Sequence, residues 1–297
     1  MLSSNTKLLT QEFEYFAPKT LEEALDLLYK YKDKNTKILA GGTDLLVKMK
    51  TIGFEVDYLI NIKEIPELKF IDTAEGLKIG AAVPLSHIER IEKVKEKYSA
   101  LYEGLKSMAA IAVRNMATIP GNICNASPAG DTISPLIAYG AELKLISKSG
   151  ERIVLIEDFI TGVGETVIKK DELVTQVIIP EITKSSGSAF SKKSRVKADI
   201  AKINLAVWLK REDRTCKDCR IVFGSVFIKS IRIKKAEELL RDQAVSNDLV
   251  AKAAKKASRE IRPVDDVRST AEYRTNLAQI MAEDTLKLAW NRSGGEL

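Results

Sequence analysis

The sequence predicts an α+β fold, because hairpin patterns dominate its middle and strand patterns precede helical patterns in its last third. The chain has 297 residues, which is more than one ordinary hydrophobic core holds, so two or three subdomains are expected. Hydrophobic residues make up 45% and charged residues 30%, a balance typical of globular proteins rather than of disordered chains. The small and polar stretch 183–188 predicts the main domain boundary.

The N-terminal part is expected to form a helix, a short strand and a second helix. A capping box ahead of apolar residues at helical period predicts the first helix, over 21–31. The apolar run 38–40 predicts a buried strand, which Gly41-Gly42 breaks. Thr43-Asp44 then offers N-cap side chains for a helix through 45–49. The local pattern is therefore strand, Gly-Gly, helix.

The middle of the chain is expected to alternate between hairpins and short helices. Two strands over 68–83 flank a turn at Glu75-Gly76, and two more flank Ser149-Gly150. The stretch 114–135 is rich in Asn, Gly, Ser, Pro and Asp, so it is expected to be a long functional loop. The other expected elements are helices around 87–91 and 99–110, strands over 142–147 and 152–156, and a strand over 173–179.

The C-terminal part is expected to place three strands before three helices. In the last helix, five apolar residues share one face, which is expected to pack on a sheet: Tyr273, Leu277, Ile280, Met281 and Leu288. The expected strands are 189–193, 203–209 and 219–227, and the expected helices are 234–240, 249–261 and 271–290.

The charge and apolar patterns argue against several classes of protein. The net charge is +6, but Lys and Arg are mixed with acids along the whole chain, which favours a solvated surface over a nucleic-acid groove. No stretch approaches about 18 consecutive apolar residues, so no membrane span is expected. Residues 1–15 lack the basic and apolar regions of a secretory signal, and a cytoplasmic location is expected.

Histidine and cysteine are scarce, which limits the available chemistry. His87 is the only histidine; it excludes a His-rich metal site and is expected to be an ordinary surface or core residue. The three cysteines, Cys124, Cys216 and Cys219, do not suggest a disulfide framework. Cys216 and Cys219 form a C-x-x-C that cannot complete a four-thiolate site alone, so an incidental pair is favoured over a redox or metal role. No metal site is expected.

Two segments have the composition of a dinucleotide site. In Ala40-Gly41-Gly42-Thr43-Asp44-Leu45-Leu46, the glycines allow the backbone to approach a pyrophosphate and the following helix presents free N–H groups. The loop 117–131 offers hydroxyls, amides, glycines and one carboxylate within 15 positions. Taken singly, each segment is equally well explained as a structural turn or a self-bonded loop. Neither the Rossmann glycine pattern nor the P-loop pattern is present.

Together the two segments resemble a known family. AGGTDLL (40–46) and TIPGNICNASPAGD (118–131) resemble the two FAD-binding segments of the medium subunit of xanthine dehydrogenase, CO dehydrogenase and related molybdenum hydroxylases. The similarity continues through 171–180, 198–207 and 262–274 and so covers nearly the whole chain. It implies a vanillyl-alcohol-oxidase (PCMH-type) FAD-binding fold. The implied domains are 1–182, with subdomains of about 1–57 and 58–182, and a C-terminal α+β domain over 189–292 with an antiparallel sheet and helices.

The resemblance also implies which residues contact FAD. The first segment should line the pyrophosphate, the second should contact FAD through its polar residues, and Val174 falls where the family has an apolar flavin contact. A lysine near the start of the C-terminal domain contacts FAD in relatives; Ser191 sits at the ungapped position, and Lys192, one step on, is chosen. The implied cofactor-binding set is Lys37, Ile38, Leu39, Ala40, Gly41, Gly42, Thr43, Asp44, Leu45, Thr118, Gly121, Asn122, Cys124, Asp131, Val174 and Lys192.

Pro120 departs from the family pattern, because many relatives have glycine there. Proline fixes φ and removes an N–H donor. If that donor binds phosphate in relatives, one hydrogen bond is lost, worth roughly 0.5–1.5 kcal/mol net. FAD binding is then expected to be weaker without being abolished.

The function that the resemblance implies is electron transfer, with no catalytic residue in this chain. A molybdopterin-containing large subunit would hydroxylate a substrate, a small subunit with two [2Fe–2S] clusters would carry electrons to FAD, and the flavin would pass them to NAD or another acceptor. Two alternatives stay open. A self-sufficient flavin oxidase usually needs a larger substrate domain than the roughly 110 residues after the linker. A scaffold subunit that has lost FAD is the other, and Pro120 is the feature that points to it.

Overall fold

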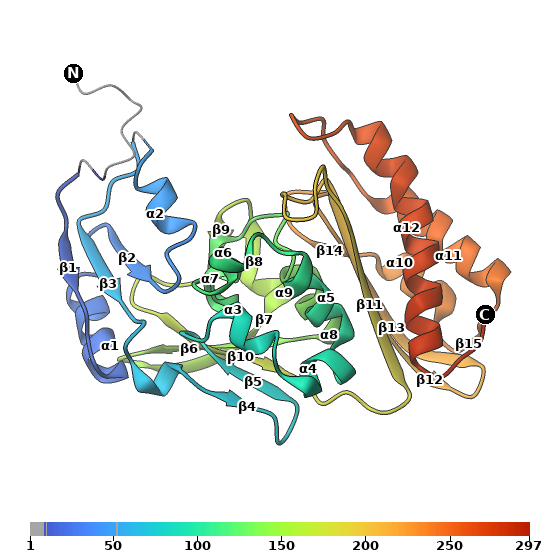
Figure 1. Ribbon diagram of the computed structural model, residues 1–297, viewed down its shortest axis with the longest axis horizontal. Coiled ribbons are helices and arrows are strands. Elements are labelled where there is room, and N and C mark those ends of the chain that lie inside the picture. The colour runs from blue at the N-terminus through green and yellow to red at the C-terminus, as the bar shows by residue number, and fades with distance from the viewer. Residues whose placement is uncertain (1–8, 10, 52) are drawn as a thin grey trace.

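The structure, a computed structural model, describes residue 9, residues 11–51 and residues 53–297. It is an α+β protein in three consecutive units, which confirms the predicted fold class (Figure 1). A small N-terminal unit, blue in the figure, precedes a middle unit built on an antiparallel sheet, and a C-terminal sheet covered by helices follows. The expectation of no secretory signal concerned residues 1–15, of which residues 1–8 and 10 lie outside the described part.

The N-terminal unit is a three-stranded parallel sheet with a ten-residue helix and a single helical turn. The predicted capping box begins the ten-residue helix, because the Thr20 side chain accepts a hydrogen bond from the backbone N–H of Glu23 at 3.1 Å. The helix buries Ala24, Leu25 and Leu28, so its apolar face closes the core of this unit. The sheet order is β1-β3-β2, and the elements are β1 (Glu14–Phe16), α1 (Leu21–Lys30), β2 (Thr36–Leu39) and β3 (Tyr58–Asn61).

The helix after the Gly-Gly corner is shorter than predicted. It is α2 (Leu45–Lys48), a single turn. Asp44 occupies its N-cap position, as predicted, but its side chain makes no capping hydrogen bond. One turn of helix has a small dipole, and an anion at this corner must therefore be bound mainly by backbone N–H groups.

The middle unit is built on a five-stranded antiparallel sheet of order β4-β5-β10-β6-β7. Both predicted hairpins are present, as β4 with β5 and as β6 with β7. The strands are β4 (Ile71–Asp72), β5 (Leu77–Gly80), β6 (Glu142–Ser147), β7 (Gly150–Leu155) and β10 (Leu173–Ile179), and a separate ribbon pairs β8 (Ile160–Gly162) with β9 (Glu165–Thr166). The helices are η1 (Pro66–Leu68), α3 (Leu85–Ile88), α4 (Glu92–Lys97), α5 (Ser99–Ser107), α6 (Ile111–Arg114), α7 (Ile119–Asn125), α8 (Ile133–Tyr139) and α9 (Ile156–Phe159).

The predicted long loop 114–135 is wrong, because α7 lies entirely within it and α8 begins in it. Thr118 caps α7 by accepting a hydrogen bond from the backbone N–H of Gly121 at 3.1 Å. Pro120 occupies the first turn of that helix, where a missing N–H leaves no intrahelical bond unmade. Ala126 ends the helix in the left-handed conformation. The polar composition of the segment reflects these caps, and its irregular parts are residues 115–118 and 126–132.

The C-terminal unit is an antiparallel sheet that is covered on both faces. Phe190, Ala206 and Val222 face the core of the middle unit, whereas Ala189, Leu205 and Phe223 face the C-terminal helices. The predicted linker 183–188 is shorter than expected, because the first strand already begins at Ser186. The strands are β11 (Ser186–Lys193), β12 (Ile203–Glu212), β13 (Thr215–Gly224), β14 (Ile231–Arg232) and β15 (Gln243–Ala244), and the helices are α10 (Lys234–Leu240), α11 (Asn247–Glu260) and α12 (Ala271–Arg292).

The buried face of α12 is not the one predicted. Tyr273, Ile280 and Leu288 are 47%, 61% and 42% exposed, so the apolar stripe of this helix points largely away from the core. Small side chains such as Ala278, Ala282 and Ala289 face the core instead, together with Met281, Leu286 and Trp290. Small residues allow a helix axis to approach its support closely, and here Gly187 of β11 lies against Ala289. No helix within the described residues has the length and apolar composition needed to cross a membrane.

Candidate functional site

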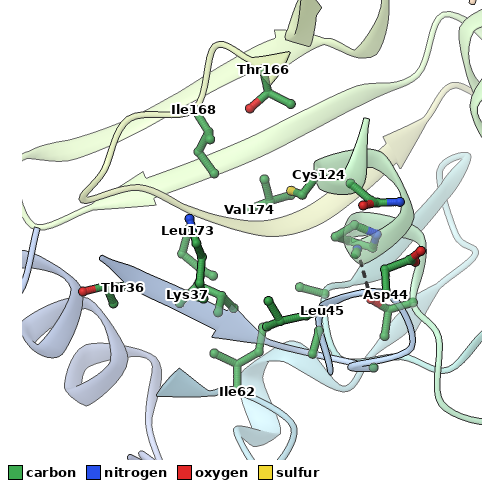
Figure 2. A pocket seen from close by; sticks show the side chains of 18 of the residues that line it. Thr36, Lys37, Asp44, Leu45, Ile62, Cys124, Thr166, Ile168, Leu173 and Val174 are labelled. Carbon is green, nitrogen blue, oxygen red and sulfur yellow. Dashed lines mark hydrogen bonds between the residues drawn. The ribbon is translucent and has the colours of Figure 1, made fainter. Parts of the chain in front are cut away.

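A cavity of about 770 Å³ lies between the N-terminal and middle units. Figure 2 shows Thr36, Lys37, Asp44 and Leu45 on one side, facing a second wall that contains Thr166, Ile168, Val174 and Cys124. The first wall comes from β2 and the Gly-Gly corner, and the second from α7 and the segment that leads into β10. The two segments singled out in the sequence thus meet at one cavity.

The Gly-Gly corner is held tightly against the second segment. A Cβ at Gly41 would overlap the backbone carbonyl of Met116 and lie 2.7 Å from the Cα of Ala117, so only glycine fits there. Gly42 has φ of +74°, in the left-handed region that favours glycine. Among the described residues, the backbone N–H groups from Gly41 to Leu45 donate to no protein acceptor. A run of unsatisfied N–H groups facing a cavity is suited to binding phosphate oxygens.

Side chains of the second segment are fixed by hydrogen bonds at the cavity wall. Asn122 is 8% exposed, and its Oδ1 accepts a hydrogen bond from Thr132 Oγ1 at 2.8 Å. Lys48 Nζ donates to Asn125 Oδ1 at 2.6 Å and so joins α2 to α7 across the cavity. The wall is therefore held in place by contacts within the protein, and a ligand meets a preformed surface.

The charge of the cavity favours an anion. Of the acids in the lining, Glu172 has its charge offset by Arg152, whose Nε and Nη2 donate hydrogen bonds to the Glu172 carboxylate at 2.7 and 2.8 Å. An excess of lysine in a concave site raises the local concentration of anionic ligands. The lining lysines are Lys32, Lys34, Lys37, Lys48, Lys169 and Lys170, against the acids Asp33, Asp44 and Glu172.

The three cysteines occupy different environments. Cys124 lines the cavity and is exposed to it, while the surrounding protein atoms raise the pKa of its thiol to about 12. The thiol is therefore neutral at pH 7. Cys216 and Cys219 are buried in the core between the C-terminal sheet and helices. Within the described part of the chain, no group of three or more His, Cys, Asp or Glu side chains is placed to hold a metal ion. His87 is exposed on α3 and does not line the cavity.

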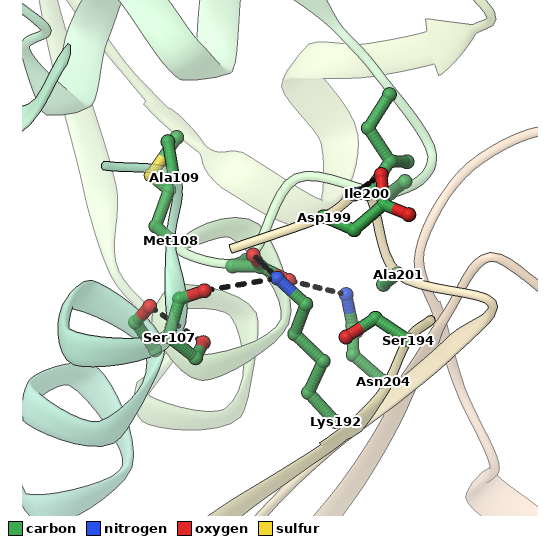
Figure 3. A network of polar contacts seen from close by, with 12 residues as sticks. Ser107, Met108, Ala109, Lys192, Ser194, Asp199, Ile200, Ala201 and Asn204 are labelled. Carbon is green, nitrogen blue, oxygen red and sulfur yellow. Dashed lines mark hydrogen bonds and ion pairs between the residues drawn. The ribbon is translucent and has the colours of Figure 1, made fainter. Parts of the chain in front are cut away.

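The cavity brings together most of the sixteen predicted cofactor-binding residues. Leu39 does not line it, because alternate residues of a strand face opposite sides and this side chain is buried in a small core. Asp131 and Lys192 do not line it either; they form a buried ion pair at 2.6 Å behind the second segment (Figure 3). Burial raises the pKa of Asp131 to about 6, although Lys192 acts to lower it. The lining residues are Lys37, Ile38, Ala40, Gly41, Gly42, Thr43, Asp44, Leu45, Thr118, Gly121, Asn122, Cys124 and Val174.

Sequence reasoning missed two stretches of the lining. One is 32–36, from the turn after α1 to the first residue of β2, and the other is 164–173, which ends at the first residue of β10. Both are rich in lysine and polar residues, so each resembles an ordinary solvated turn. These segments differ from ordinary surface loops only in the folded chain, where some of their residues are buried or partly buried and others are exposed. Met108, between α5 and α6, was also missed. Other single lining residues outside the predicted set include Leu28, Lys48, Phe54, Ile62, Ala81, Ala117 and Asn125.

Comparison with known proteins gives two family matches. Residues 11–182 match the FAD binding domain in molybdopterin dehydrogenase, and residues 188–289 match the CO dehydrogenase flavoprotein C-terminal domain. The chain is 32% identical over 277 residues to the glyceraldehyde dehydrogenase medium chain of Sulfolobus acidocaldarius, covering 93% of this chain and 98% of that one. It is 35% identical over 236 residues to the nicotinate dehydrogenase FAD-subunit of Eubacterium barkeri, covering 77% and 80%.

Solved structures show the same fold. A chain of carbon monoxide dehydrogenase from Hydrogenophaga pseudoflava superposes with a TM-score of 0.91 at 31% identity, covering 96% of this chain and 99% of that one. A chain of quinoline 2-oxidoreductase from Pseudomonas putida 86 gives a TM-score of 0.88 at 26% identity, covering 95% and 99%.

Proposed function

Because this chain belongs to the family of FAD-binding subunits of molybdopterin dehydrogenases, we propose that its cavity holds FAD and that electrons pass through this flavin from an iron–sulfur partner to NAD or another acceptor. The observation that carries the proposal is the run of backbone N–H groups from Gly41 to Leu45, which meet no acceptor within the described part of the chain and lie against the second segment in a lysine-rich cavity. A dinucleotide has a pyrophosphate that can accept hydrogen bonds from these N–H groups and whose negative charge the lysines can offset.

The residues present divide the work of holding FAD. The Gly-Gly corner donates backbone N–H groups to the pyrophosphate, and the lysines around it offset the negative charge. Apolar side chains such as Ile62, Ile168, Leu173 and Val174 give the ring systems an apolar surface. When bound, FAD supplies the redox chemistry itself, and the chain orients it and excludes water. Asp131 and Lys192 stay in the proposed set as a buried pair directly behind the wall.

The partners that we propose are those of a molybdenum hydroxylase. Relatives of this chain are named as a medium chain or an FAD-subunit of dehydrogenases, which supports a place beside other subunits. We infer a molybdopterin-containing large subunit and a [2Fe–2S] small subunit, with the complex in the cytoplasm.

The experiment that tests the proposal combines cofactor content with thiol labelling. The purified chain is expected to show absorption bands near about 375 and 450 nm and to release about one FAD per chain. Cys124 is the cysteine exposed to the cavity, so in the FAD-free protein it is expected to be labelled by a small maleimide near neutral pH, more slowly than an ordinary cysteine because its raised pKa leaves little thiolate. Added FAD is expected to slow that labelling at least about tenfold.

The controls for this experiment lie within the chain and among the cofactors. Cys216 and Cys219 should stay unlabelled in both states until the protein is unfolded, because both are buried. FAD that binds without protecting Cys124 would place the cofactor elsewhere. A colourless protein that takes up no added FAD would contradict the proposal and favour a scaffold subunit.

Pro120 lies in the cavity wall, where its ring replaces an N–H donor. We expect Pro120→Gly to strengthen FAD binding by up to about tenfold, because one additional backbone donor is worth roughly 0.5–1.5 kcal/mol. Pro120→Ala also restores the donor and keeps helical propensity, so it serves as the matched variant. Equilibrium titration of the FAD-free protein gives both dissociation constants. If both variants bind FAD as the natural protein does, the missing donor has no role in binding.

A further inference from the structure

Buried polar side chains form a connected path from the cavity wall to the C-terminal sheet. Asn122 lines the cavity and is held by Thr132, whose neighbour in the chain is Asp131. The Asp131 carboxylate accepts hydrogen bonds from Lys192 Nζ at 2.6 Å and from Asn204 Nδ2 at 3.4 Å. Figure 3 shows Lys192 and Asn204 extending side by side from β11 and β12 toward this carboxylate.

Asn204 is the central residue of this path. It is 0% exposed, and its Oδ1 accepts a hydrogen bond from Ser134 Oγ at 2.7 Å. Because that contact uses the oxygen of the amide, the amide nitrogen must turn toward Asp131. Ser134 itself lies within 3.4 Å of Ser230 Oγ. A buried amide of this kind is costly to leave unpaired, so its orientation is well defined.

Two glycines show how closely the backbone surrounds the path. A Cβ at Gly224 of β13 would overlap Asn204 Oδ1 and lie 2.9 Å from Ser134 Oγ. A Cβ at Gly104 of α5 would lie 2.6 Å from the backbone carbonyl oxygen of Asp131. Asp131 is therefore in contact with α5, β11 and β12. A small displacement of the Asn204 side chain would consequently displace the Asp131 carboxylate.

We propose that Asn204 is a positioning residue for FAD binding: its amide orients the Asp131 carboxylate against Lys192 and thereby fixes the segment that presents Asn122 to the cavity. This inference rests on the proposed function, because it takes the cavity as the FAD site. It adds Asn204 of β12 to the part that β11 plays through Lys192, although among the described residues no member of this sheet lines the cavity.

The path also predicts a pH dependence of FAD affinity. Burial raises the pKa of Asp131 to about 6, while Lys192 and the Asn204 amide lower it. The charged group that faces Asp131 is Lys192 of β11. The other groups around this pair are Gly104 and the Ser107 carbonyl of α5 and Asn204 of β12, and none of them titrates. Removing the amide donor should therefore raise the pKa further, so the ion pair forms only at higher pH.

The test measures the FAD dissociation constant from pH 5 to 8 in the full chain. Asn204→Ala is expected to weaken binding about tenfold at pH 6.5 and to move the half-maximal pH upward by at least about half a unit. Gly224→Ala keeps Asn204 but pushes its amide out of place, because the added Cβ would overlap Asn204 Oδ1. It should therefore have the same effect as Asn204→Ala. The double variant should be no weaker than either, because alanine at 204 leaves room for the added Cβ.

Ser258→Ala is the control, since Ser258 is a buried serine of α11 in the same unit, hydrogen-bonded within its own helix. Whatever its effect on stability, Ser258→Ala should leave the pH profile unchanged. Equal profiles in Asn204→Ala and Ser258→Ala overturn the inference. If even the natural protein takes up no FAD, the proposed function fails instead.

In that case, hydrogen exchange of residues 118–132 in the FAD-free protein tests the positioning role of Asn204 by itself. Faster exchange in Asn204→Ala and Gly224→Ala, but not in Ser258→Ala, supports that role. Equal exchange in all variants overturns it.

Discussion

Lys192→Met is expected to lower the free energy of unfolding by about 3–5 kcal/mol, the usual result of removing one partner of a buried ion pair. Lys192 and Asp131 are 5% and 6% exposed at their side chains and lie 2.6 Å apart. Methionine fills much of the same volume but leaves the Asp131 carboxylate without its cation. The loss is therefore electrostatic rather than a loss of packing.

The penalty of Lys192→Met should depend on pH. The pKa of Asp131 is raised to about 6 from an ordinary value of 3.8, so between these values the folded state binds the proton more tightly than the unfolded state. The contribution of this group to stability therefore falls as the pH rises through that window. Without Lys192 the pKa of Asp131 rises further, so the pH range over which stability falls extends to higher pH. The variant should consequently be closest to the natural protein near pH 5 and most destabilised near pH 8.

Urea unfolding at pH 5 and pH 8 measures the effect, and two variants complete the experiment. Asp131→Asn in the Lys192→Met background should restore part of the stability, because it removes the buried charge. Lys95→Met, which breaks the exposed pair with Glu92, should change the stability by less than about 1 kcal/mol. A Lys192→Met variant as stable as Lys95→Met at pH 8 would show that the buried pair contributes little.

The sequence predicts regular elements well where local signals are strong. The strand β10 and the helix α10 have the predicted bounds. Apolar and β-branched residues followed by Pro180 identify the strand, and a clear helical period identifies the helix. The helix α7 was missed because Thr118, Pro120 and Gly121 have the composition of a loop, although they are an N-cap, a first-turn proline and the residue whose N–H the cap receives. Residues that favour turns also begin helices, and composition alone does not separate the two uses.

The lining of the cavity was predicted best at the Gly-Gly corner. The corner at Gly41-Gly42 is a local signal, and the structure places it in the cavity. Asp131 and Lys192 are 61 residues apart in the chain, and their buried pair depends on contact between two units, which no local pattern specifies. The face of α12 illustrates the same limit: its apolar stripe predicts one buried side, but tight packing against β11 requires small residues and selects another.

Gly41→Ala is expected to weaken FAD binding at least about 100-fold, which corresponds to about 2.7 kcal/mol. The added Cβ cannot be accommodated by rotating a side chain, because it meets the Met116 carbonyl and the Ala117 Cα, both backbone atoms. The corner and the second segment must separate, and the backbone donors from Gly41 to Leu45 then lose their aim at the pyrophosphate. Losing two or three hydrogen bonds of roughly 0.5–1.5 kcal/mol each accounts for the expected magnitude.

Gly187→Ala separates this local effect from general destabilisation. Its Cβ would overlap the carbonyl of Ala289 and lie 2.6 Å from the Ser293 nitrogen, a comparable clash between backbones in the C-terminal unit. Both variants should unfold at lower temperature, but only Gly41→Ala should lose FAD affinity when titrated well below its unfolding transition. If the two variants bind FAD equally well, the cofactor does not depend on the close approach of the two segments, and the Gly-Gly corner is a structural turn. If only Gly41→Ala fails, the contact between the two segments is what shapes the pyrophosphate site.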